Sequence, residues 1–236
     1  WCKRLLEVLD GKGSPNSAVR ALLACAYQPT ENSGKVTRAA AEAVAAAIGA
    51  EFHIIDIGAQ HKAYIAGTEQ AIGRPLAWDV DDLTLQNIQA RVRAPSIWML
   101  ANVRGSILIT TSNRSEAAVG YATMDGDTAG GLAPLGGIDK SFLRTWLVFM
   151  EKKGLVGGEP LPALAAINTQ QPTAELRPSQ YAQTDEADLM PYDFLEAVED
   201  SAIRDKHTPI EVLQELLPRY PQQAPGQLAL WIERFF

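Results

Sequence analysis

Residues 106–131 read SILITTSNRSEAAVGYATMDGDTAGG, an apolar run that continues directly into hydroxyls, acids and glycines. The first part, residues 106–111, has the length and apolar character of a strand buried in a parallel sheet. In open α/β sheets, ligands bind at the carboxyl ends of the strands. The polar residues from Thr110 onward therefore occupy the position where such a fold places its binding groups.

Strands and helices alternate on the N-terminal side of this stretch. AVRALLACAY, residues 18–27, is a nearly continuous apolar run that ends before Pro29, and EFHIIDI, residues 51–57, is a second strand candidate. Apolar spacing, with Gly and Pro at the ends, predicts the intervening helices. Those helices are expected at residues 35–48, 59–72, 81–93 and 95–102, and the carboxylates of Asp81 and Asp82 suit the start of the third. This alternation predicts a parallel sheet wound by right-handed crossovers.

Beyond Lys140 the pattern becomes mostly helical, with a loop-rich stretch at residues 157–190. The expected helices are residues 140–153, 191–206, 209–217 and 223–236. No internal repeat or long Gly/Ser linker divides the chain. We therefore expect one α/β domain, with a core of about residues 18–155 and a loop-rich, helical C-terminal part of about residues 156–236.

Composition excludes several classes of protein. The chain has 236 residues, of which 47% are hydrophobic, and 21 Lys and Arg against 28 Asp and Glu give a net charge of −7. This charge argues against nucleic acid as the main partner. No run approaches the roughly 18 apolar residues that span a bilayer, and the first residues lack the pattern of a secretory signal. A cytoplasmic protein that does not enter membranes is expected.

The polar segment offers both ligand-binding and purely structural interpretations. Residues 110–113 supply hydroxyl and amide groups, and exposed backbone N–H groups at the start of the following helix favour an anion. Asp125 and Asp127 supply oxygen ligands of the kind that Mg2+ prefers. However, Asn113 and Glu116 also have the spacing of a helix-capping box, and MDGD also suits an ordinary acidic turn.

A longer block favours the first interpretation. TSNRSEAAVGYATMDGDTAGGLAPLGGIDK, residues 111–140, resembles the synthetase domain of bacterial glutamine-dependent NAD+ synthetases. QNIQARVR at residues 86–93 and YQPTENS at residues 27–33 extend the resemblance, as do PTAEL and QTDE within residues 172–186. It runs from about residue 18 to 199. The resemblance implies a Rossmann-like parallel sheet of the ATP-pyrophosphatase, or adenine nucleotide alpha hydrolase, type.

The resemblance also implies a reaction and its participants. ATP adenylates the nicotinate carboxylate of deamido-NAD+, and ammonia then displaces AMP to form the amide of NAD+. Mg2+ neutralises charge on the departing pyrophosphate. In long family members a glutaminase domain supplies the ammonia from glutamine, and family members are homo-oligomers.

The resemblance assigns residues to two substrates and to none of the roles of nucleophile, acid or base. The residues expected to contact ATP are Thr111, Lys140 and Thr173. The residues expected to contact deamido-NAD+ are Asn87, Arg91 and Glu116, with Glu116 alternatively a Mg2+ ligand.

Each assignment has a physical counterpart and a plainer alternative. Asn87 and Arg91 lie four apart, so a helix places them on one face, although that face could be solvated. Lys140 begins a helix, where a cation is unfavourable and needs an anionic partner, although it could be merely exposed. Thr111 could be a strand-terminal hydroxyl, and Glu116 a cap.

Two family features do not occur in the 236 residues, namely the SGGxDS phosphate loop and the glutaminase domain. Because charge stabilisation at the triphosphate dominates such chemistry, activity of the isolated chain is expected to depend on the phosphate loop. A non-catalytic nucleotide-binding or oligomerisation module therefore stays an alternative. Another ATP-pyrophosphatase amidase, such as a GMP-synthetase-like enzyme, is a second one. A dehydrogenase is disfavoured because no G-x-G-x-x-G follows a first strand.

Overall fold

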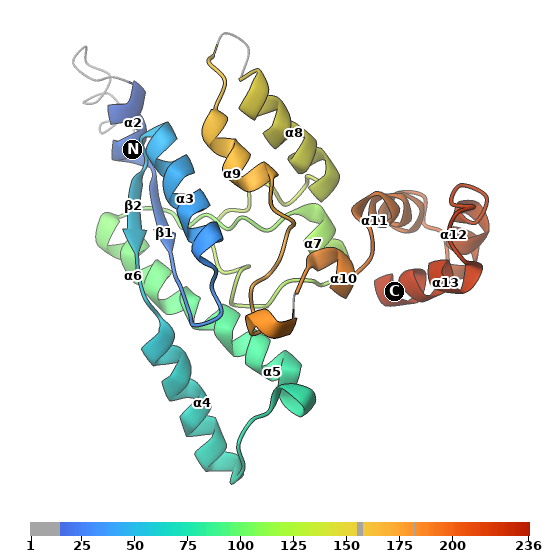
Figure 1. Cartoon of the computed structure of the whole chain (residues 1–236), viewed down its shortest axis with the longest axis horizontal. Helices are drawn as coiled ribbons and strands as arrows, with labels where there is room; N and C mark the ends of the chain where they lie inside the picture. The colour runs from blue at the N-terminus through green and yellow to red at the C-terminus, as the bar shows by residue number, and fades with distance from the viewer. Residues whose placement is uncertain (1–14, 155–157, 182) are drawn as a thin grey trace.

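In the part of the chain that the structure describes, the sheet consists of two parallel strands joined by a helix. The structure, a computed structural model, describes residues 15–154, 158–181 and 183–236. Strand β1 (Ala24–Tyr27) pairs with β2 (Glu51–Ile54), with Ala24 opposite Glu51. Helix α3 (Lys35–Ile48) connects the strands and packs against both (Figure 1). The described part is therefore a helix-rich α/β fold with a small parallel sheet.

Helix α3 has the predicted bounds, and its end shows why. Gly49 follows it with a φ of 75°, and its amide donates to the carbonyls of Ala45 and Ala46. A left-handed residue closes the helix in this way with little strain only if it is glycine. Gly73 ends the next predicted helix, α4 (Gly58–Ile72), in the same way, with a φ of 72°.

The first predicted strand is only half right. Residues 18–22 belong to helix α2 (Pro15–Leu22), and only Ala24–Tyr27 is extended. A continuous apolar run suits a helix as well as a buried strand, so the run itself does not decide between them. The second predicted strand is likewise shortened to Glu51–Ile54.

The next two predicted helices are longer than expected. Helix α5 (Trp78–Arg91) bends at Asp81, whose φ of −113° and ψ of 23° are not helical. The Asp81 carboxylate accepts hydrogen bonds from the amide of Ala77 and from Arg74. The residue expected to start the helix is therefore the residue at which the longer helix bends. Pro95 lies in the first turn of α6 (Arg93–Arg104), where its missing N–H costs no helical hydrogen bond.

The predicted third strand is wrong as a member of the sheet. Residues 106–111 make one parallel bridge, between Ile109 and Leu132. Within the described ranges no backbone hydrogen bond joins them to β1. Instead β1 and residues 106–111 both line a cavity of about 1780 Å3. Ile107 and Ile109 are accordingly 51% and 44% exposed rather than buried.

The C-terminal part is helical, as predicted. After the short helix α7 (Arg114–Ala118), the shorter elements include α9 (Ala165–Asn168) and α10 (Asp185–Asp188). The remaining elements are α8 (Lys140–Lys152), η1 (Pro162–Leu164), η2 (Ser179–Tyr181), α11 (Tyr192–Glu199), the π-helical η3 (Asp200–Arg204), α12 (Pro209–Leu216) and α13 (Pro225–Phe235). No helix in the described ranges is long and apolar enough to cross a bilayer.

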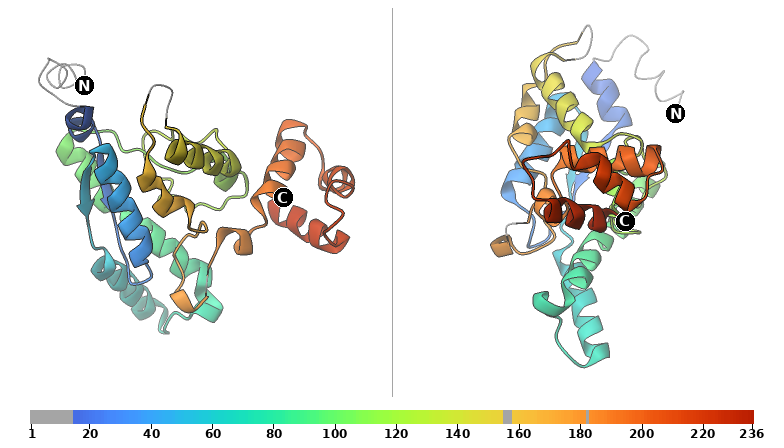
Figure 2. Two further views of the ribbon diagram at one scale, coloured as in Figure 1. Left: turned by 45° about the horizontal axis from the view of Figure 1, so that its top comes forward. Right: turned by 90° about the vertical axis from the view of Figure 1, so that its right-hand side faces the viewer.

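The largest cluster of buried apolar side chains lies in the last helices. Phe194 of α11 is 1% exposed and contacts the edge of Tyr220, with ring centroids 5.0 Å apart. Val212 and Leu216 of α12 and Leu228 of α13 complete the centre of this cluster. Figure 2 shows α11 to α13 grouped beside the α/β part. The predicted division near residues 155–156 falls outside the described residues and stays a prediction.

Candidate functional site

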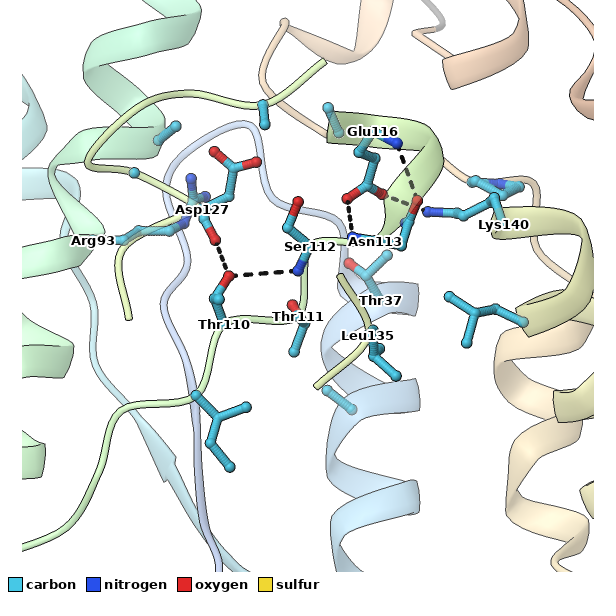
Figure 3. A pocket seen from close by; sticks show the side chains of 18 of the residues that line it. Thr37, Arg93, Thr110, Thr111, Ser112, Asn113, Glu116, Asp127, Leu135 and Lys140 are labelled. Carbon is cyan, nitrogen blue, oxygen red and sulfur yellow. Dashed lines mark hydrogen bonds and ion pairs between the residues drawn. The ribbon is translucent and has the colours of Figure 1, made fainter. Parts of the chain in front are cut away.

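Glu116 has both a structural contact and a contact in the cavity. Asn113 Oδ1 accepts from the Glu116 amide at 3.1 Å, and Glu116 Oε2 accepts from the Asn113 amide at 3.3 Å. This is the capping box expected from their spacing. The other oxygen, Oε1, accepts from Lys140 Nζ at 2.8 Å (Figure 3). The cap therefore uses one carboxylate oxygen and leaves the second one to other partners.

Lys140 has the anionic partner that its place at a helix start requires. It is the first residue of α8, after Asp139, which accepts from the Phe142 amide as the helix cap. Its ammonium lies 2.8 Å from Glu116 and 3.9 Å from Asp185 Oδ2. All three side chains line the cavity. A cation is thus held at the cavity wall by carboxylates from two other elements.

Hydroxyl groups at the end of residues 106–113 are partly available to a ligand. Thr110 Oγ1 donates to the carbonyl of Asp127 at 2.6 Å, so it is occupied. The hydroxyls of Thr111 and Ser112 line the cavity and have no hydrogen-bond partner among the described residues. Figure 3 shows Ser112 between Asp127 and Glu116. The predicted strand-end position of Thr111 is therefore open to the cavity.

Of the two acids expected to suit a cation, only Asp127 lines the cavity. Its Oδ1 accepts from the Thr123 amide at 2.7 Å. Loss of surrounding water raises the pKa of Asp127, and the nearby negative charge of Glu116 adds to that rise. Asp125 has a φ of 61° and is exposed outside the cavity lining, so it acts as a turn residue here.

Arg93 is a cavity residue that the sequence interpretation missed. Its guanidinium donates to the carbonyls of Gln28 and Gln89 and has no carboxylate within ion-pair distance in the described ranges. Burial lowers its pKa. Its place in QNIQARVR, two residues after Arg91, was the available signal.

Asn87 and Arg91 do not reach the same place. Asn87 lines the cavity and accepts from Thr123 Oγ1 at 3.0 Å. Arg91 is exposed, donates to the carbonyl of Met124 at 3.0 Å and is not part of the cavity lining. Four residues advance a helix by about 6 Å and rotate it by about 40°. Both residues lie toward the same side of the helix, but only Asn87 lies at the cavity.

Residues 172–181 and 183–188 include side chains that bind α5. Thr173, Asp185 and Glu186 of this segment line the cavity. Arg177 donates to Asp82 at 2.8 and 2.9 Å and to Asp188 at 2.7 Å. The hydrogen bond with Arg177 is the main cause that lowers the pKa of Asp82. Arg177 therefore links this wall of the cavity to α5.

We expect Arg177→Met to lower the free energy of unfolding by about 1–2 kcal/mol, because Asp82 loses its bidentate partner and Asp188 loses one charged hydrogen bond. Urea unfolding followed by circular dichroism measures the change. Arg204→Met is the matched control, since Arg204 also pairs with two aspartates but its side chain is 64% exposed. We expect no measurable loss for the control. Equal losses in the two variants would contradict the role of Arg177.

This chain resembles known proteins both in sequence and in structure. The family model for NAD synthase matches residues 16–232. This chain belongs to the NAD synthase family. It is 35% identical over 193 residues to the glutamine-dependent NAD(+) synthetase of Aquifex aeolicus, over 82% of this chain and 32% of that protein. The crystal structure of a glutamine-dependent NAD(+) synthetase from Cytophaga hutchinsonii matches with a TM-score of 0.81 and 40% identity.

The matches also give the share of each relative's length that this NAD synthase family chain covers. The Cytophaga match covers 98% of this chain and 36% of that structure. The NMN synthetase from Francisella tularensis, at 21% identity and a TM-score of 0.64 over 93% of this chain, shows the shared fold alone. The chain therefore spans about a third of the glutamine-dependent relatives it matches.

The site of this NAD synthase family member suits Mg2+ only with help from a ligand. No group of three or more His, Cys, Asp or Glu side chains within the described ranges is arranged to hold a metal. Mg2+ in nucleotide sites is commonly held by one or two carboxylates and completed by phosphate oxygens and water. Glu116 and Asp127 are two such carboxylates in one cavity. These residues fit the ion if a phosphate ligand supplies the remaining oxygens.

Proposed function

We propose that this chain forms a synthetase domain that amidates deamido-NAD+ to NAD+ with ATP and ammonia, through an adenylated intermediate. The observation that carries the proposal is that the Glu116–Lys140 pair shares a cavity with the hydroxyls of Thr111 and Ser112, which have no hydrogen-bond partner among the described residues. A cation, a carboxylate and open hydroxyls in one large cavity suit a polyphosphate and a second substrate together. The family match and the parallel arrangement support the ATP-pyrophosphatase type of fold.

The proposal divides the cavity between the two substrates. Lys140, Thr111 and Thr173 would contact ATP, because they contribute one cation and two hydroxyls to the lining. Asn87 and Glu116 would contact deamido-NAD+, and Glu116 is alternatively the Mg2+ ligand. Arg91 lies outside the lining, so its contact with deamido-NAD+ stays a prediction without support from this geometry.

The chemistry explains why positive charge is needed at this wall. A carboxylate is a poor electrophile, and transfer of an adenylyl group to it creates a leaving group that ammonia can displace. Pyrophosphate leaves in the first step, when the carboxylate attacks the α-phosphorus of ATP, and Lys140 would stabilise the negative charge that develops on it, with bound Mg2+ neutralising it further. The role of the free hydroxyls would be to orient the phosphates for attack by the nicotinate carboxylate.

The proposed function also includes a second domain, self-association and a cellular location. A glutaminase domain would supply ammonia in the complete protein, as the names of its relatives suggest. Self-association is supported by exposed apolar side chains on α5 and α6. These are Val80, Leu83, Met99 and Val103, at 67–86% exposure. A cytoplasmic location is part of the same proposal, as is the lack of a nucleic acid partner.

The test is an isotope-transfer assay on the complete protein that contains these residues. It uses deamido-NAD+ with an 18O-labelled nicotinate carboxylate, ATP, Mg2+ and ammonium chloride. Adenylation of the carboxylate forms a C–O–P bridge, and attack by ammonia cleaves its C–O bond, so one 18O passes into AMP while the amide forms. Mass spectrometry is expected to find labelled AMP in step with NAD+.

Two results would decide for the alternatives. NAD+ formation with unlabelled AMP would contradict the adenylated intermediate. Nucleotide binding without any NAD+ would favour a non-catalytic module. Adding xanthosine monophosphate or nicotinate mononucleotide as a competitor tests the remaining alternative, because another amidase of this fold would convert its own substrate in preference to deamido-NAD+.

A further inference from the structure

Lys140 lies between two carboxylates that come from different parts of the chain. Glu116, in α7, is 2.8 Å from the ammonium, and Asp185, at the start of α10, is 3.9 Å away. The Lys140 and Glu116 side chains are about one-fifth exposed, whereas that of Asp185 is 7% exposed. Figure 3 shows the Lys140 ammonium directed at Glu116. The more buried carboxylate is thus the one that the lysine does not contact directly.

Asp185 has one satisfied and one unsatisfied oxygen. Oδ2 accepts from the Tyr192 hydroxyl at 2.6 Å. Oδ1 is shielded from solvent and has no hydrogen-bond partner in the described part of the chain. A buried carboxylate oxygen without a donor is unfavourable, and such exceptions are rare enough to require an explanation. A donor that arrives in another state of the site would supply one.

Lys140 is a cationic donor close to this carboxylate, with its ammonium 3.9 Å from Oδ2. An ammonium has three N–H groups, and a lysine side chain reorients easily about its flexible stem. The lysine also has a reason to move. Glu116 Oε2 is occupied by the helix cap, so a divalent cation would bind Oε1, which now accepts from Lys140. Two cations repel each other at a shared oxygen.

We propose that Asp185 is a positioning residue for Lys140. When a divalent cation takes the place of the Lys140 ammonium on Glu116, Asp185 accepts that ammonium. This inference rests on the proposed function, in the alternative in which Glu116 is the Mg2+ ligand. Asp185 would keep the displaced ammonium at the cavity wall, beside the phosphates. Tyr192 orients the carboxylate for this contact by occupying Oδ2 and leaving Oδ1 free.

Mn2+ binding in the presence of saturating ADP tests the proposal without turnover. Electron paramagnetic resonance measures free Mn2+ for the wild-type complete protein and for Asp185→Asn. We expect the variant to raise the Kd for Mn2+ about tenfold, because Lys140 then stays on Glu116. In a Lys140→Met background the same substitution is expected to change the Kd by less than about twofold, because no ammonium remains to be moved.

A second variant covers the case in which Asp185→Asn does not fold. Tyr192→Phe keeps the carboxylate but removes its orienting hydrogen bond, and we expect a rise in the Mn2+ Kd of about threefold. Thermal melting of each variant separates this effect from loss of structure.

Three results would overturn the inference. An unchanged Kd in folded Asp185→Asn would show that the second carboxylate does not assist, while leaving the proposed function intact. An equal rise in the Lys140→Met background would show a general effect of charge rather than positioning of Lys140. Failure of the wild-type protein to form NAD+ in the isotope-transfer assay would remove both the proposed function and the inference, and this result is read separately from the Mn2+ Kd.

Discussion

Glu116→Gln in the complete protein is expected to lower kcat/KM for NAD+ formation by about 10²–10³-fold, with a Tm within about 2 °C of the wild type. The substitution removes the charge that faces Lys140 and the cavity. It keeps the cap, because glutamine serves in a capping box as glutamate does. Steady-state kinetics and differential scanning calorimetry on the same preparation measure the two effects.

Glu116→Ala is the matched control, since it removes both roles of this side chain. We expect a similar loss of kcat/KM and an additional loss of about 1 kcal/mol in the free energy of unfolding, because the Asn113 amide then loses its acceptor. If Glu116→Gln keeps full activity per folded molecule and only Glu116→Ala is impaired, the carboxylate is a helix cap and nothing more.

Stability should also depend on pH at the wall formed by residues 172–188. The pKa of Asp82 is lowered in the folded state by Arg177. A group of this kind stabilises the fold above its unfolded pKa, and the contribution is lost as the pH falls through its lower folded pKa. The difference in unfolding free energy between wild type and Arg177→Met should therefore shrink below about pH 4.

Helices were predictable because their signals are local. The bounds of α3 follow from apolar spacing and a glycine one residue after its end, and both signals lie within 15 consecutive residues. The kink in α5 shows the limit. Asp81 is a residue type that is common at helix starts, but here it lies inside a longer helix, where its carboxylate accepts a hydrogen bond from Arg74. That contact spans seven residues and has no signature in a helical pattern.

The third strand could not be predicted from its own residues. An apolar run becomes a sheet strand only if a neighbouring backbone is in place, and that neighbour is not encoded locally. Residues 106–111 pair with the segment around Leu132 on one side. Across the cavity, β1 is too far away to pair within the described ranges.

The sequence predicted several residues that line the cavity, but not how they pair. Ligand binding by Glu116 and Lys140 stays a prediction, whereas the structure shows that they bind each other across 24 residues of sequence. Asp185 lies in the QTDE segment, yet nothing in that segment indicates a buried oxygen without a donor. Arg93 was missed because periodicity does not show which face of α6 meets the cavity.

Lys140→Met is expected to lower kcat/KM by about 10²-fold, mainly through a higher KM for ATP, because the cavity wall then lacks its ammonium. Lys140→Arg should retain more activity, since it keeps the charge but changes the geometry of its contacts. Kinetics with ATP varied at saturating deamido-NAD+ measure both. An unchanged KM and kcat in Lys140→Met would remove the lysine from the phosphate site.

The double variant Lys140→Met, Glu116→Gln separates the fold from the function of this pair. Lys140→Met alone leaves a largely buried carboxylate without its cation, and we expect it to lower the free energy of unfolding by about 1–2 kcal/mol. Adding Glu116→Gln removes the uncompensated charge, so most of that stability should return, as urea unfolding measures. Activity should stay low, because the site still lacks both charged groups. Recovery of activity together with stability would mean that the pair serves folding only.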